Sequence, residues 1–64
     1  MAKKWDYTIE NAQEAFNVWF GTKRGLFRIG CGLTEANQQA NTKIRKLTGS
    51  RMKAWFDLLD KEGR

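Results

Sequence analysis

Residues 37–46 place amide, hydroxyl and cationic side chains at spacings that suit contacts with nucleic acid. On a helix, one face would carry four polar residues separated by steps of three, one and three: Gln38, Asn41, Thr42 and Arg45. A side-chain amide can pair with two atoms of adenine, and a guanidinium can do the same with guanine. We therefore expect these four side chains to read base edges in the major groove of duplex DNA.

The middle of the chain is strongly basic. Residues 23–53 contain eight lysines and arginines and a single carboxylate, Glu35, for a net charge of +7, whereas residues 1–22 and 54–64 each sum to −1. Such a charge distribution is typical of a surface that binds a polyanion, although a solvated face or a docking surface for an acidic protein would give the same count. On DNA, we expect five of the cations to hold phosphates: Lys23, Arg24, Arg28, Lys43 and Lys46.

The composition disfavours catalysis. The chain has no histidine and one cysteine, Cys31, so it lacks the commonest general base, a Cys-His pair and the usual zinc ligand sets. Its glycines are not followed by the Gly-Lys-Ser/Thr of a phosphate-binding loop. The sequence therefore predicts a binding protein with no cofactor and no metal, rather than an enzyme.

The polar face from Gln38 to Arg45 would lie on the most clearly marked helix of the chain, residues 34–48. Thr34 is suited to the N-cap, and Gly49 to the position just past the end. The apolar residues recur at steps of four, four and three: Ala36, Ala40, Ile44 and Leu47.

Two further helices are predicted near residues 9–20 and 51–62. Thr8 and Gly21 bound the first, and Ser50 would cap the second. Their apolar stripes comprise Ile9, Ala12, Phe16, Trp19 and Phe20 in the first and Met52, Trp55, Phe56 and Leu59 in the second.

Residues 14–31 also permit a β-hairpin. Apolar residues alternate on both sides of a glycine-containing turn at residues 21–25, as they do in paired strands. Residues 12–15 favour the helix, and so do its caps. The glycines at 25, 30 and 32 argue against a long helix over residues 22–33. A short helix near 23–29, an irregular turn and a strand all remain possible for this segment.

The predicted architecture is one small all-α domain, residues 1–64, of three to four helices with a helix-turn-helix arrangement and an N-terminal arm at residues 1–7. The alternative is an α+β fold in which an N-terminal hairpin packs on two C-terminal helices. In the preferred register, residues 34–48 are the recognition helix. In the other, Gly49 is the turn and residues 50–60 form the recognition helix, with Arg51 and Lys53 leading. Trp5 and Tyr7 of the arm are expected to fold back on the domain. The tryptophans could stack on single-stranded bases, but the stripes place Trp19 and Trp55 in the core.

Together these features predict a small DNA-binding regulator, of the type that phage, plasmid and other compact genomes encode. The alternative is a module or inhibitor that binds an acidic partner protein through the same cations and exposed aromatic residues. The large apolar stock for a chain of 64 residues also makes a homodimer an open possibility. No membrane span or signal peptide is predicted, so a cytoplasmic location is expected.

Overall fold

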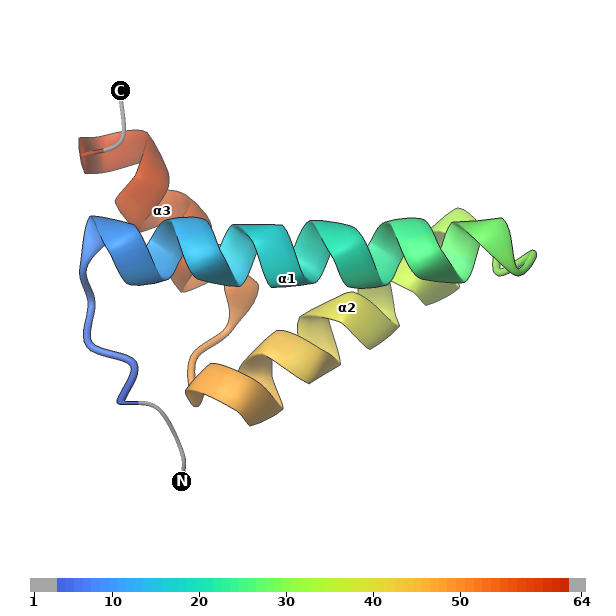
Figure 1. Ribbon diagram of the computed structural model, residues 1–64, viewed down its shortest axis with the longest axis horizontal. Coiled ribbons are helices and arrows are strands. Elements are labelled where there is room, and N and C mark those ends of the chain that lie inside the picture. The colour runs from blue at the N-terminus through green and yellow to red at the C-terminus, as the bar shows by residue number, and fades with distance from the viewer. Residues whose placement is uncertain (1–3, 63–64) are drawn as a thin grey trace.

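The computed structural model describes residues 4–62, and these residues form three helices and no strand. Helix α1 spans Ile9–Arg28, α2 spans Leu33–Thr48 and α3 spans Met52–Glu62. α1 packs against both other helices, whereas α2 and α3 have few contacts with each other. α2 crosses α1 obliquely, and α3 lies beside the N-terminal half of α1 (Figure 1). The predicted all-α fold is confirmed, and the hairpin alternative for residues 14–31 is wrong.

α1 is eight residues longer than the sequence predicted. Gly21 and Gly25 lie inside the helix, and the separate short helix expected near residues 23–29 is its last two turns. The helix continues because the half-buried Thr22 and Leu26 extend its packed face along α2. Adding residues to an existing helix costs far less than nucleating a new one, so packing outweighs the weak propensity of two glycines. The helix ends at Arg28, followed by Gly30 with a φ of +94°.

The helix ends partly follow the predicted caps. The Oγ1 of Thr8 accepts a hydrogen bond from the backbone N–H of Asn11, and Gly49 ends α2 with a φ of +80°. Two predicted caps are wrong. α2 begins at Leu33 after Gly32 rather than at Thr34, and α3 begins at Met52, two residues after Ser50.

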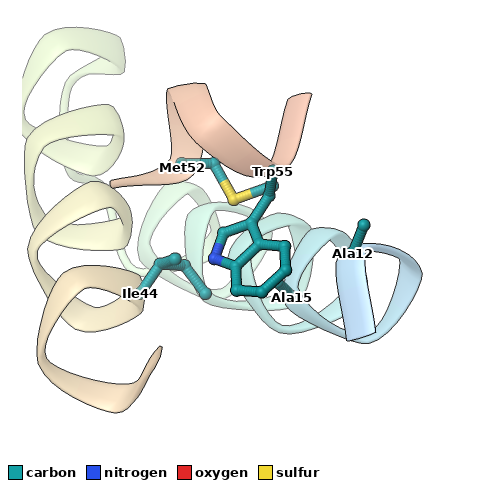
Figure 2. Packing of buried hydrophobic residues seen from close by; sticks show 5 residues of the cluster. All are labelled: Ala12, Ala15, Ile44, Met52 and Trp55. Carbon is teal, nitrogen blue, oxygen red and sulfur yellow. The ribbon is translucent and has the colours of Figure 1, made fainter. Parts of the chain in front are cut away.

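The core is small and centres on Trp55. In Figure 2 its indole lies between Ile44 of α2 and Ala15 of α1, with Met52 on the remaining side. The Nε1 of Trp55 donates a hydrogen bond of 3.1 Å to the Oγ1 of Thr48, so the buried ring has no unsatisfied donor. The chain extends 33 × 31 × 14 Å, and such a thin molecule leaves many large apolar side chains at the surface.

The arm packs against the core from below α1, as expected. The ring of Trp5 meets Trp55 edge-on at 6.0 Å between centroids, and that of Tyr7 lies 4.9 Å from Trp55. The Tyr7 hydroxyl also shares a hydrogen bond of 2.6 Å with Ser50, which joins the arm to the α2–α3 loop. Residues 1–3 of the predicted arm lie outside the described residues. Within residues 4–62, no helix combines the length and apolarity that crossing a membrane requires.

Candidate nucleic-acid interface

A cleft opens where the three helices meet on one side of the molecule. We call it the central cleft; its volume is about 580 Å³. Four cations reach it, and none of its lining residues is acidic. It is lined by Trp19 and Lys23 of α1, Asn37, Asn41, Thr42 and Arg45 of α2, and Arg51, Met52, Lys53 and Phe56 at the start of α3.

Trp19 forms the floor of the central cleft. The Nζ of Lys23 lies 4.9 Å from the centroid of the indole, which places a positive charge over the ring face. Phe56 meets the indole edge-on at 5.1 Å and an interplanar angle of 86°. The sequence assigned Trp19 to the core, and the structure places it half in the core and half in the cleft.

Two asparagines of α2 face this floor. The Oδ1 of Asn41 accepts a hydrogen bond of 2.7 Å from the Nε1 of Trp19. The amide NH₂ of Asn41 and the second lone pair of its oxygen remain for a ligand. The Oδ1 of Asn37 is buried and has no hydrogen-bond partner. An unpartnered buried acceptor costs free energy. Asn37 was not among the predicted site residues.

The outer face of α2 carries a shallow depression beside the central cleft. It is lined by Gln38, Gln39, Thr42, Lys43, Lys46 and Leu47. Thr42 lines both hollows, so the two adjoin. Glu35 is the one carboxylate of residues 23–53. Its Oε1 accepts a hydrogen bond of 3.3 Å from the Nε2 of Gln39.

A third, narrower hollow follows the C-terminal half of α1. This α1 depression has a volume of about 330 Å³ and is lined by Phe20, Lys23, Arg24, Phe27 and Arg28. Lys23 lines both the central cleft and the α1 depression, so these two hollows adjoin. We call the three hollows together the basic surface; its cations are Lys23, Arg24, Arg28, Lys43, Arg45, Lys46, Arg51 and Lys53.

No family model, curated protein or solved structure matches this chain.

The structure therefore brings all ten predicted site residues to three adjoining hollows. Five line the central cleft, namely Lys23, Asn41, Thr42, Arg45 and Arg51. The sequence placed Lys53 only in the less favoured register, and it did not assign Asn37, Trp19 or Phe56 to the site. The charge of residues 23–53 already contained Lys53, but the aromatic residues gave no signal because they also continue the apolar stripes.

Proposed function

We propose that this protein binds DNA through the basic surface. The observation that supports the proposal is the composition of the central cleft: cations from three helices converge there, and no lining side chain is acidic. A phosphate backbone entering the cleft would displace condensed counterions, and their release would supply most of the binding free energy.

In this arrangement α2 faces the duplex. Its outer face offers Gln38, Thr42 and Arg45 to base edges, while Lys43 and Lys46 flank them and suit phosphates. Asn41 offers mainly its NH₂ group as a donor, because its oxygen already accepts a hydrogen bond from Trp19. The sequence suggests that the protein is a small regulator that acts in the cytoplasm, as a monomer or a homodimer.

Titration with random-sequence duplex DNA at low and moderate salt tests the proposal. We expect binding that weakens steeply with salt, with a log–log slope of about −3 to −4 for four phosphate contacts. Lys53→Gln should reduce that slope by about one. Lys61→Gln removes the same charge from the last turn of α3, outside the hollows, and is the matched control. Absence of binding at low salt by the folded protein would contradict the proposal.

A second candidate function is docking to an acidic protein. It is favoured by two exposed apolar residues at the α1–α2 turn. Ile29, directly after the cationic Arg28, is 77% exposed, and Leu33, at the start of α2, is 54% exposed. A stoichiometric protein partner that is recovered after nuclease treatment, and lost in Ile29→Ser, would support this function over DNA binding.

A further inference from the structure

Four aromatic rings form a continuous cluster across the α1–α3 seam. The centroid of Phe16 lies 6.1 Å from Trp19, 6.0 Å from Phe20 and 5.9 Å from Phe56. Phe16 and Trp19 are half-buried, whereas Phe20 and Phe56 are 48% and 37% exposed. The inner rings therefore pack against the outer two, which present part of their apolar surface to solvent.

Cations border this cluster on both sides. Phe56 lies in the central cleft with Lys53 and Arg51, and Phe20 lies in the α1 depression with Arg24. Phe27, 47% exposed, continues the aromatic row about 10 Å further along the axis of α1, at 1.5 Å per residue. No carboxylate lines either hollow.

We propose that these exposed rings bind unpaired bases, so that the protein prefers DNA containing a single-stranded segment to fully paired DNA. This inference rests on the proposed DNA-binding function, and it specifies which form of DNA the same surface binds. In a duplex, the faces of the bases are stacked on one another and cannot reach a protein ring. An unpaired base has a free face, and each base that stacks on an aromatic side chain commonly raises affinity by roughly tenfold.

The positive charge of this surface favours a single DNA strand over other ligands. A second copy of the chain, docked through the same surface, would bring two sets of like charges together. An uncharged apolar segment would cover Arg24 and Lys53 without compensating their charges, which is costly. A single strand supplies a phosphate for the cations and a base for the rings at every nucleotide.

Affinity for four DNA probes tests the inference: a blunt duplex, the same duplex with a short thymidine overhang, the same duplex with an abasic overhang of equal length, and the isolated overhang strand. The abasic overhang carries the same phosphates without bases, so it separates stacking from charge. We expect the thymidine overhang to bind about tenfold more tightly than the abasic one.

The double variant Phe20→Leu/Phe27→Leu removes two of the three exposed rings of this surface and leaves Phe56, so it should reduce this difference to about threefold or less. It retains every cation of the basic surface, so the salt slope measured with blunt duplex should stay the same. Both side chains are exposed, so the fold should persist, as circular dichroism can verify. Leu33→Ala removes exposed apolar area outside the hollows and should keep the difference. Equal affinity for thymidine and abasic overhangs, or a difference that is undiminished in the double variant, would overturn the inference and leave DNA binding standing. Absence of binding to all four probes at low salt would overturn both.

Discussion

The indole of Trp19 and the amide of Asn41 are joined by a hydrogen bond of 2.7 Å between Nε1 and Oδ1, across the α1–α2 contact. This bond fixes the floor of the central cleft relative to the helix that we propose faces DNA. It also holds the amide of Asn41 in one orientation, with its oxygen turned toward α1.

A double-mutant cycle should measure this bond. We expect Trp19→Phe and Asn41→Ala to show a coupling free energy of about 0.5–1 kcal/mol in urea denaturation, the usual net value for a hydrogen bond near the surface. Pairing Trp19→Phe with Gln38→Ala, on the outer face of the same helix, should give no coupling. A coupling near zero for Trp19 and Asn41 would mean that the bond does not stabilise the cleft.

Replacement of Trp55 should unfold the domain. The side chain is fully buried among residues of all three helices, and it supports the rings of Trp5 and Tyr7. Truncation of such a residue costs about 3–5 kcal/mol. At typical values per residue, the whole stability of a domain of this size is roughly 3–10 kcal/mol.

We therefore expect Trp55→Ala to lose most of its helical circular dichroism signal at ambient temperature. Ile44→Val, at another fully buried position, removes one methyl group and should cost only about 0.5–1.5 kcal/mol. A cooperative unfolding transition of Trp55→Ala near that of the unmodified protein would show that the core lies elsewhere.

The two glycines inside α1 should be sites of stabilisation. Gly21 and Gly25 are exposed, their φ angles are not positive, and a Cβ at either position would meet no atom within 4 Å. We expect Gly21→Ala and Gly25→Ala each to raise the free energy of unfolding by about 0.5–1 kcal/mol, because alanine restricts the unfolded chain and favours the helix.

Gly49→Ala is the contrasting variant. Its surroundings are equally open, but its φ of +80° disfavours a Cβ, so we expect a loss of about 1 kcal/mol. Urea denaturation of the three variants gives the comparison. A loss of stability in Gly21→Ala would imply that α1 breaks where the sequence alone predicted its end.

Local sequence signals specified α2 but not α1. Ala36, Ala40 and Ile44 predicted both the helix and its buried face, because the residues after them carry no conflicting signal before Gly49. Gly21 looked like a helix end because glycine is common there. Leu26 lies beyond Gly21 and is half-buried, and α1 packs against α2. Such packing between helices cannot be inferred from a local window of the sequence.

The sequence likewise predicted one part of the candidate site, its cations, and not the other, its aromatic rings. Charge alone indicated the cations, because residues 23–53 hold eight lysines and arginines and one carboxylate. The charge count did not give the directions in which these side chains point. The aromatic rings were missed for a geometric reason. Phe20 and Phe56 continue apolar stripes, and only the way α3 packs beside α1 decides that the edge of each stripe remains in solvent.

Substitutions within the basic surface should separate base reading from phosphate binding. Arg45 lies on the wall of the central cleft and on the face of α2 that carries Thr42, so its guanidinium can reach a base edge. Arg24 lies on α1, in a hollow without amide side chains, and suits a phosphate. We expect Arg45→Ala to weaken binding to a selected site by about 1–3 kcal/mol and to relax the preference at one position.

Arg24→Ala, and likewise Lys23→Ala, should instead weaken binding to all sequences alike and reduce the salt slope by about one, because counterion release depends on charge and not on sequence. Selection of a preferred duplex from a random pool, followed by titration of that duplex and of a scrambled one, provides the measurement. If Arg45→Ala binds the selected duplex as tightly as the unmodified protein, Arg45 does not belong to the DNA-contacting residues. If Arg24→Ala alters the preference between the two duplexes, α1 takes part in base reading.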